Sequence, residues 1–402
     1  MAQTLSNASA ALKDFYLPGI RSQLNDDIPL LQYVEKNTED VEGKAAVLSI
    51  GLKRNAGVGF RPDGGTLPTA GQQGFGEERV ALRYAQARGE ITGPTIRASR
   101  SDKGSFARLL KYEMQRLRTD LRRDTNRQLW GTTDGKIATC TVASNTVVIG
   151  LATATTVVQM RQFEVGMLVD IGAVATPTGA TSANAIVSVD IANKTITLTT
   201  AITTATTDFV FRSGNVGVSV SYELTGMQSI VDSSGALFNL NPATAGQAAW
   251  ASTEQGSVGA ISENVIASNI HAVQIASGEW VDMAFTSDGV HRAFANLLTS
   301  LKRFPGTRDL KGGYKGLDFA AGGPTVPVVW DRDCPGGTMF LVNTKHVTEY
   351  QGNDWDWMDN DGSSLSRVAN KDAYEFTLVK DMELTTDQRN AHAKLTGITE
   401  AS

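Results

Sequence analysis

The chain has 402 residues, of which 41% are hydrophobic and 20% charged, and no apolar run approaches the ~20 residues that a membrane-spanning helix needs. At roughly 150 residues per domain, this length predicts two or three packed units. The net charge of −5 argues against a protein that binds DNA tightly, because such a protein neutralises many phosphates.

Charge is spread unevenly along the chain. From Arg100 to Arg127 there are nine Lys or Arg against four acids, whereas from Asp331 onward there are thirteen acids against seven bases. Such polarity suits a molecule that pairs with itself, although a solvated helix face is the commoner origin of a charge run. The sequence starts without the basic and apolar regions of a secretory signal, so we expect no Sec export.

Residues 1–44 are predicted to form a polar arm followed by a helix. Ile20, Leu24, Ile28 and Leu31 recur at spacings of four and three residues, which is typical of one helical face. Pro29 falls inside this stripe, so the helix should kink or restart there.

Residues 45–92 are predicted to form a long β-hairpin, with extended segments at Ala45–Lys53 and Glu78–Tyr84. Between them, residues 57–76 hold seven glycines and two prolines, and the only large apolar side chains there are those of Val58, Phe60, Leu67 and Phe75. Legs of about twenty residues, at roughly 3.3 Å each, reach up to ~65 Å. A compact 300-residue body has a radius of gyration of about 19 Å, so the hairpin should fold back or lie across another molecule. The alternative is a disordered loop.

A long helix is predicted from about Ser105 to Trp130, with Ser101 and Asp102 as cap candidates and Gly131 as its stop. At 1.5 Å per residue it spans about 40 Å. It carries one apolar stripe, made of Phe106, Leu110, Met114, Leu117, Leu121 and Leu129. Its arginines offer a surface to an acidic partner or form a solvated face; they are Arg116, Arg118, Arg122, Arg123 and Arg127.

Residues 137–212 differ in composition from the rest, with seventeen threonines and seven charged residues among seventy-six. Five short strands are expected, near residues 146–149, 167–171, 185–190, 195–199 and 208–212. They predict an inserted small β-barrel with a decorating or stabilising role. The insert lacks the aromatic and basic surface of a nucleic-acid-binding barrel.

The remainder alternates between strands and helices, which predicts an α+β body over residues 213–340. Strands are expected at Val216–Tyr222, Trp280–Phe285 and Val326–Trp330, and a helix after its cap Ser287. Residues 341–402 are predicted to be mostly extended, to be interrupted by a loop from Gly352 to Ser364, and to return against the long helix.

No catalytic or cofactor motif occurs in the sequence, and we predict that the chain is not an enzyme and holds no cofactor or metal. The four histidines lie singly, and Cys140 and Cys334 are too isolated to indicate zinc, so both are expected to be free thiols. The acids from Asp354 to Asp361 resemble a calcium loop, but Met358 stands where a ligand should and the twelfth position has no glutamate. A secreted β-rich hydrolase or lectin using these acids is one alternative. Nearby Trp355 and Trp357 are expected to be strand residues at a contact surface.

The order of elements resembles that of the major capsid proteins of tailed bacteriophages, whose shell fold herpesviruses share. On the hairpin the resemblance is carried by Lys53-Arg54-Asn55-Ala56-Gly57-Val58-Gly59 and Leu67-Pro68-Thr69-Ala70-Gly71. On the helix and near the return it is carried by Glu113, Asp120, Asn126-Arg127, Trp130-Gly131 and Gly337-Thr338-Met339-Phe340-Leu341-Val342-Asn343.

The resemblance implies an α+β fold in six parts. These are an N-terminal arm (1–44), an extended loop (45–92), a peripheral domain with a spine helix (93–136), the inserted β domain (137–212), an axial domain (213–340) and peripheral return strands (341–402). It implies a virion shell of hexamers and pentamers that encloses double-stranded DNA without sequence-specific binding. It also implies synthesis in the host cytoplasm, a portal and a possible decoration protein. Some relatives carry a scaffolding segment of about a hundred residues before the arm; none is seen here, so a separate scaffolding protein is expected.

Some members of that family crosslink their subunits from a lysine on the extended loop. Residues 57–76 contain no lysine, so a non-covalent shell is expected. The hairpin should bury Phe60, Leu67 and Phe75 against a neighbour, with Arg54, Arg61 and Arg79 pairing with acids there. An encapsulin-like cellular compartment, which shares the fold, is the alternative function.

Overall fold

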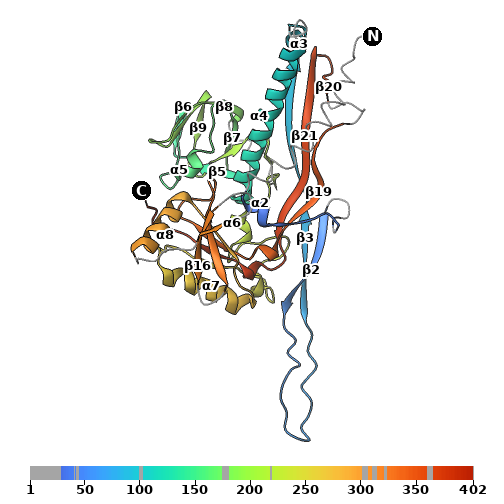
Figure 1. The fold of residues 1–402 in the computed structure, drawn as a ribbon, viewed down its shortest axis with the longest axis vertical. Helices are drawn as coiled ribbons and strands as arrows, with labels where there is room; N and C mark the ends of the chain where they lie inside the picture. The colour runs from blue at the N-terminus through green and yellow to red at the C-terminus, as the bar shows by residue number, and fades with distance from the viewer. Residues whose placement is uncertain are drawn as a thin grey trace.

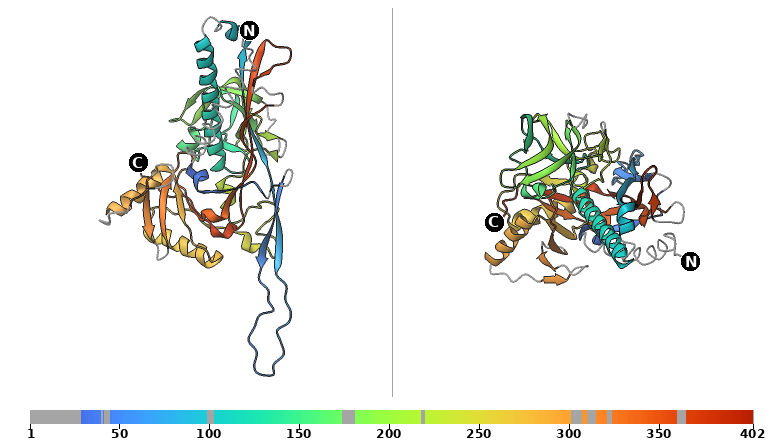
Figure 2. Two further views of the ribbon diagram at one scale, coloured as in Figure 1. Left: turned by 45° about the vertical axis from the view of Figure 1, so that its right-hand side comes forward. Right: turned by 90° about the horizontal axis from the view of Figure 1, so that it is seen from above.

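The structure is a computed structural model, and it describes residues 29–39, 41, 45–98, 103–173, 181–217, 220–300, 307–309, 315–320, 324–359 and 365–401. Three packed units and one projecting hairpin make up the described chain (Figure 1). A long helix, α4 (Lys103–Leu129), lies between the inserted β unit and a sheet of long strands, as Figure 1 and the view from above in Figure 2 show.

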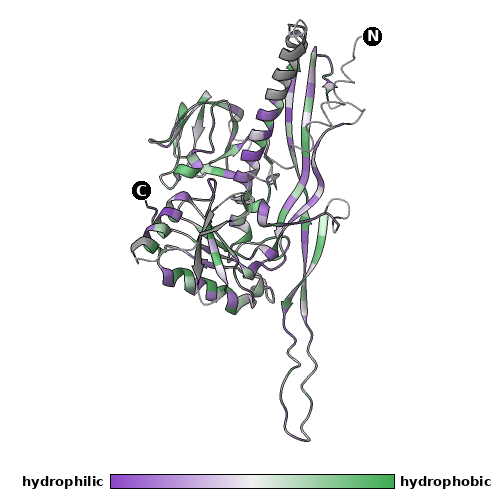
Figure 3. Ribbon diagram, viewed as in Figure 1, coloured by the Kyte–Doolittle hydropathy of each residue, from purple (hydrophilic) through white to green (hydrophobic). Residues whose placement is uncertain are grey.

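The sheet beside α4, which we call the peripheral sheet, has the order β1-β19-β21-β20, with β4 also paired to β21. Polar and apolar residues alternate along β4 and β21 (Figure 3), so one face is apolar. That face packs against α4, where Met114 shares a buried cluster with Trp355, Trp357 and Phe376. The prediction that the C-terminal strands return against the long helix is therefore confirmed. The strands are β1 (Glu35–Asn37), β4 (Arg83–Thr92), β19 (Val347–Trp357), β20 (Ser366–Arg367) and β21 (Ala373–Thr386).

Two short helices flank these elements, α2 (Pro29–Tyr33) and α3 (Gly93–Ala98). Pro29 opens α2, as the predicted restart requires, because the fixed φ of proline suits the first helical position and its missing N–H costs nothing there. The predicted caps Ser101 and Asp102, and residues 1–28 of the arm, lie outside the described residues.

The insert forms a six-stranded sheet with the order β5-β10-β7-β8-β9-β6, and it contains all five predicted strands. Just beyond the edge strands β5 and β6, a bridge joins Cys140 to Leu151, so the two ends of the sheet approach each other. Full closure into a barrel stays a prediction. The elements are β5 (Lys136–Thr139), β6 (Ala143–Gly150), α5 (Val157–Met160), β7 (Leu168–Gly172), β8 (Thr181–Asp190), β9 (Thr195–Thr204) and β10 (Phe209–Arg212).

The third unit, which we call the axial unit, is a seven-stranded sheet of order β13-β22-β18-β14-β17-β16-β15. Ala284 and Leu341 face α7 and α8, whereas Phe285 and Phe340 face the opposite core, which also holds Trp130 from the end of α4. The elements are β13 (Thr253–Gln255), α7 (Glu263–Ser277), β14 (Met283–Thr286), α8 (Asp288–Ser300), β15 (Thr307–Asp309), β16 (Lys315–Ala320), β17 (Thr325–Trp330), β18 (Met339–Val342) and β22 (Ala393–Leu395). Short connecting elements are β11 (Val216–Gly217), β12 (Val220–Ser221), α6 (Met227–Ile230), η2 (Ala248–Trp250), η4 (Thr344–His346) and η5 (Arg389–Ala391).

Three sequence-based expectations differ from the structure. The single strand expected at Val216–Tyr222 is instead the small hairpin of β11 and β12. The loop expected from Gly352 starts later, because β19 continues to Trp357. The C-terminal strand β22 pairs with β18 in the axial sheet, whereas residues 341–402 were all assigned to the peripheral return.

Candidate assembly surface

The projecting hairpin, which we call the ribbon (residues 45–81), is a two-stranded antiparallel ladder with a long tip. β2 (Ala45–Lys53) pairs with β3 (Gly74–Ala81), and the two strands share no sheet with the rest of the described chain. The predicted hairpin is therefore present, but its second strand begins before Glu78, and Tyr84 belongs instead to β4, which pairs with β21 in the peripheral sheet. In both strands the even-numbered residues are the more buried ones. The ladder therefore has an inner face towards the body and an outer face that is exposed.

The inner face fixes the base of the ribbon to the axial unit. Leu52 packs against the core cluster that contains Leu240. The backbone N–H of Arg79 donates to the carbonyl of Phe238 at 3.3 Å. A Cβ on Gly76 would lie 2.6 Å from Leu52 Cδ1, so glycine allows this close approach.

Beyond the ladder, the tip (residues 54–73) first narrows to a waist. The backbones of Gly57 and Gly71 meet there, since a Cβ on Gly71 would lie only 2.7 Å from the Gly57 nitrogen. Asn55 Oδ1 accepts a hydrogen bond from the Gly57 N–H at 2.7 Å, which holds one leg in place. Glycine is needed at this waist because any side chain would separate the legs.

Past the waist the legs diverge and are closed by a turn. Gly65 N–H donates to the Pro62 carbonyl at 2.9 Å, and Arg61 Nε donates to the Thr66 carbonyl at 3.1 Å. The Gly65–Pro62 bond is the only backbone–backbone hydrogen bond within the tip. The tip is therefore extended chain whose polar backbone is mostly unpaired.

All six residues predicted to contact a neighbour lie on exposed parts of the ribbon. Phe60 is fully exposed, Leu67 is 88% exposed and Phe75 is 70% exposed. The structure brings Phe60, Arg61 and Leu67 to the tip, Arg54 to its first leg, and Phe75 and Arg79 to the outer face of β3. Their contacts with another subunit stay predictions.

Two further exposed apolar residues were left out of that predicted set. Val58 is 81% exposed at the tip, and Val47 is 59% exposed on the outer face of β2, opposite Arg79. Val47 could have been found from the strand alternation of Ala45–Lys53, which places it on the same face as Phe75.

Two buried carboxyl groups lie near the connection between β3 and β4. Glu78 on β3 is fully buried, and its Oε1 accepts a hydrogen bond from Thr385 Oγ1 at 2.5 Å. Burial raises the pKa of Glu78 to about 7, and Asp387 adds to the rise, although the Thr385 bond opposes it. Its Oε2 has no partner among the described residues.

The second group is Glu383 on β21. It accepts a hydrogen bond from the Thr225 N–H at 2.7 Å and one from Arg83 Nε at 3.3 Å. Burial raises the pKa of Glu383 to about 7 in spite of these bonds. The joint between the ribbon and the peripheral sheet therefore holds two acids that titrate near neutral pH.

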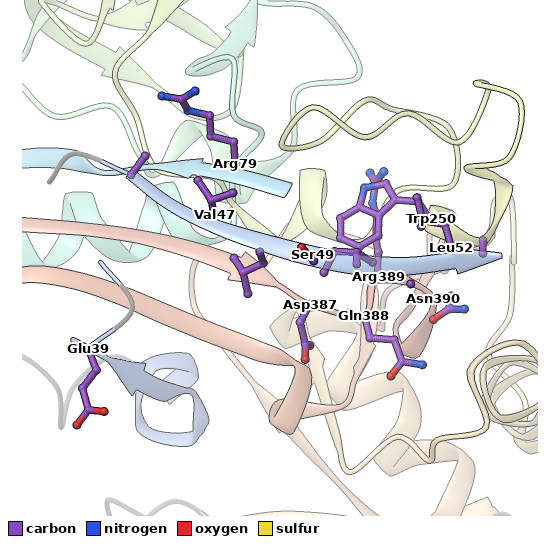
Figure 4. A pocket seen from close by; sticks show the side chains of 15 residues that line it. Glu39, Val47, Ser49, Leu52, Arg79, Trp250, Asp387, Gln388, Arg389 and Asn390 are labelled. Atoms are coloured by element: carbon purple, nitrogen blue, oxygen red, sulfur yellow. The ribbon is translucent and has the colours of Figure 1, made fainter. Parts of the chain in front are cut away.

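A groove of about 1120 Å³ runs along β2, and the rest of its lining comes from Glu39, Arg79 on β3, η2 and residues 387–390. In Figure 4, Asp387 and Gln388 lie on the other side of β2 from Arg79. Trp250 also lines the groove, and its buried Nε1–H has no acceptor among the described residues.

The arginines of α4 do not form one uniform surface. Arg127 is buried and bonded to Glu223 in a two-pronged pair, with Nη1–Oε2 at 3.1 Å, and to Asp124 at 3.0 Å. The prediction that Arg127 faces an acidic partner or the solvent is therefore wrong. Arg123 is exposed and pairs with Glu164 of the insert at 3.2 Å, so it ties the insert to the helix.

The acidic segment proposed for calcium or sugar chemistry is mostly strand. Asp354 and Asp356 lie on β19, and Asp361 is outside the described residues. Trp355 and Trp357 are strand residues, as predicted, but they are 2% and 1% exposed and face α4 rather than a contact surface. Among the described residues, no group of three or more His, Cys, Asp or Glu is arranged to hold a metal ion.

The two cysteines agree with what the sequence predicted. Cys140 and Cys334 are free and buried, as expected, and burial raises the pKa of the Cys140 thiol to about 12. None of the helices described has the length and apolarity to cross a membrane.

Comparison with known proteins finds likeness at the level of structure alone. No protein-family model matches the chain, and no curated protein matches its sequence. The capsid asymmetric unit of cyanophage A-1(L) is 14% identical, with 93% of each chain covered and a TM-score of 0.58. An empty GTA particle capsid is 10% identical, covering 94% of this chain and 90% of that one, with a TM-score of 0.48. An encapsulin complex from Synechococcus elongatus is 9% identical, covering 93% and 89%, with a TM-score of 0.47.

The likeness to the cyanophage subunit covers 93% of this chain and has a TM-score above 0.5. It shows that the chain has the α+β fold of a tailed-phage capsid subunit, which confirms the fold expected from the resemblance.

Proposed function

We propose that this chain, which has the fold of a tailed-phage capsid subunit, is the major capsid protein of such a phage. Its copies would assemble as hexamers and pentamers of an icosahedral virion shell around double-stranded DNA. The shell would be held by non-covalent contacts, in keeping with the lack of lysine between residues 57 and 76. A portal and a separate scaffolding protein would act in assembly, which would take place in the host cytoplasm.

The observation that carries this proposal is the exposed ribbon. Val58, Phe60 and Leu67 are at least 81% exposed on a hairpin that points away from the body (Figure 1). Burying one such side chain stabilises by roughly 1.5–3 kcal/mol, which the isolated subunit forgoes at three positions. Large apolar side chains held out on a projecting arm are typical of an interaction site.

The proposal is tested by assembly of the expressed chain and of a variant without the tip. Residues 57–71 are replaced by Asn-Gly, which favours a two-residue hairpin turn and leaves the β2–β3 ladder in place. We expect closed icosahedral particles from the wild type and folded, unassembled subunits from the variant, as seen by electron microscopy and light scattering. Normal closed shells from the variant would contradict the role of the ribbon.

The contents of particles made in the native host separate this function from the encapsulin alternative. Packaged double-stranded DNA is expected for a phage capsid, whereas an enzyme cargo without DNA would indicate a cellular compartment. Absence of any particle, with the wild-type chain folded and a scaffolding protein supplied, would contradict both shell functions.

A further inference from the structure

We propose that the groove along β2 receives the ribbon tip of a second copy, which adds to the open edge of β2 as an extra strand. This inference rests on the proposed function, because it names the surface to which the ribbon binds. β2 pairs with β3 alone among the described residues, so the backbone groups along its other edge have no strand partner. An open edge of nine residues is a template for an added strand.

Trp250 supplies a second reason to expect a peptide in this groove. Its side chain is 1% exposed, yet its Nε1–H has no acceptor among the described residues. Buried indole N–H groups normally donate to a partner, and an unmet donor costs about 1–3 kcal/mol. Because Trp250 lines the groove, we infer that a chain docked there supplies the missing acceptor.

The ribbon tip complements the groove in its free backbone groups and its exposed apolar side chains. It is extended, it has a single internal backbone–backbone hydrogen bond, and it exposes Val58, Phe60 and Leu67. The β2 side of the groove offers apolar side chains of its own, including Leu48, Ile50 and Leu52. Docking would therefore pair free backbone groups on both partners and bury apolar surface on both.

The tip is basic, and two acids in the groove can pair with it, although two arginines there balance the formal charge of the groove. Residues 53–76 carry three bases, Lys53, Arg54 and Arg61, against the single acid Asp63. The groove contains Glu39 and Asp387 alongside Arg79 and Arg389. Of these two arginines, Arg389 already donates to three backbone carbonyls, those of Ser229, Ile230 and Gly235.

The contact must join different copies. The tip extends beyond the ends of β2 and β3, away from the body and from the residues that line the groove (Figure 1 and the left view of Figure 2). The ribbon tip and the groove are different surfaces, so copies associate head-to-tail. They form a closed ring when the rotation between neighbouring copies divides a full turn evenly.

Cysteine cross-linking tests the contact in assembled particles. Ser49→Cys on β2 is combined in turn with Val58→Cys, Phe60→Cys or Leu67→Cys, and both native cysteines are buried. Mild oxidation should give ladders of multimers on non-reducing gels for at least one pair, and none for the four single variants. Particles that form with every pair but show no ladder would overturn the proposed groove and leave the capsid function intact.

A binding assay tests the groove without particles. A fluorescent peptide of residues 53–74 is titrated into the variant in which Asn-Gly replaces residues 57–71, and anisotropy is measured. We expect saturable binding that Trp250→Phe weakens about two- to tenfold, because one hydrogen bond is lost while the ring is kept. Saturable binding, together with a wild-type chain that never forms particles even with a scaffolding protein supplied, would support the groove and contradict the capsid function. No binding, or binding that Trp250→Phe leaves unchanged, would overturn the proposed docking.

Discussion

Lys380 and Glu349 form an ion pair that is fully buried between neighbouring strands β21 and β19. The Lys380 ammonium also lies 5.3 Å from the centre of the Trp355 ring. Removing one member of such a pair leaves a buried charge without its counter-charge. We therefore expect Lys380→Ala to lower the free energy of unfolding of the unassembled subunit by about 3–5 kcal/mol in urea.

The double variant Lys380→Met with Glu349→Leu is the matched control, because it removes both charges and keeps the apolar volume. It should retain stability to within about 1 kcal/mol of the wild type. A loss as large as that of Lys380→Ala would show that the charges themselves, and not their balance, stabilise the sheet.

Glu78 gives a residue-scale prediction of pH dependence. Its pKa is about 7 in the folded chain against 4.5 when unperturbed. Below pH 4.5 both states are protonated, and between pH 4.5 and 7 only the unfolded state loses the proton. The stability contributed by Glu78 is therefore full below pH 4.5 and falls by about 3 kcal/mol as the pH rises through 7.

Glu78→Gln isolates this effect from Glu383, which titrates in the same range. Glutamine still offers Oε1 to Thr385 but cannot ionise. The stability of Glu78→Gln relative to wild type should rise with pH between 4.5 and 7 and then level off, when urea unfolding is measured at each pH. If the difference in unfolding free energy between Glu78→Gln and wild type did not change with pH, the raised pKa of Glu78 would be contradicted.

At the scale of elements, the end of α4 depends on a close approach to α6. A Cβ on Gly226, which precedes α6, would lie 2.5 Å from the Gln128 carbonyl oxygen and nearer still to that of Gly131. Neither is a flexible side-chain end. Gly226→Ala should cost about 1–3 kcal/mol by overpacking, whereas Gly51→Ala, with nothing within 4 Å, should change stability by under about 0.5 kcal/mol. Equal midpoints for the two variants in thermal unfolding would refute this reading.

The waist of the ribbon makes a prediction about assembly rather than stability. Gly71→Ala would push the Gly57 backbone away and spread the legs of the tip, while the packed units stay untouched. Its melting temperature should match that of wild type, and the subunit concentration needed for assembly should rise about tenfold, or about 1.4 kcal/mol per subunit. Gly59→Ala is the control, because its nearest neighbour is the mobile end of Arg61 at 3.4 Å. Equal assembly of both variants would argue against a defined tip.

Elements whose patterns are local could be predicted from the sequence. The insert strands alternate and lie between turn residues, and α4 carries one apolar stripe ended by Gly131. Helix α7 was not predicted, because its β-branched and short polar residues favour helix weakly. Its ends carried the missed signal: Ser262 accepts from the Val265 N–H at 3.3 Å, and Gly278 closes the helix at φ 81°.

Features that join distant segments could not be predicted in this way. Helical spacing placed Arg127 on a polar face, but its burial depends on Glu223, which comes 96 residues later. The groove could not be predicted either, because β2, Trp250 and residues 387–390 come together only in the folded chain. The exposed ribbon residues were predictable because a glycine-rich hairpin offers nothing to cover them.

At the scale of the whole molecule, the ribbon and the groove lie on different parts of one subunit, so each copy would both donate and accept. A copy in which Asn-Gly replaces residues 57–71 would still accept a neighbour's tip but donate none. Mixed with wild type, it should enter rings and leave each with a missing contact. If one such copy stops a hexamer from closing, a 10% fraction leaves about half of the hexamers intact, from six independent positions.

Particle yield against the fraction of this variant, followed by light scattering at constant total protein, measures the effect. We expect yield to fall much more steeply than the wild-type fraction, because one defective copy disables a ring of six. Bovine serum albumin added at the same mass controls for dilution and crowding. A yield that falls only in proportion to the wild-type fraction would mean that the shortened copies are excluded, and hence that a subunit must donate its own tip before it can accept another.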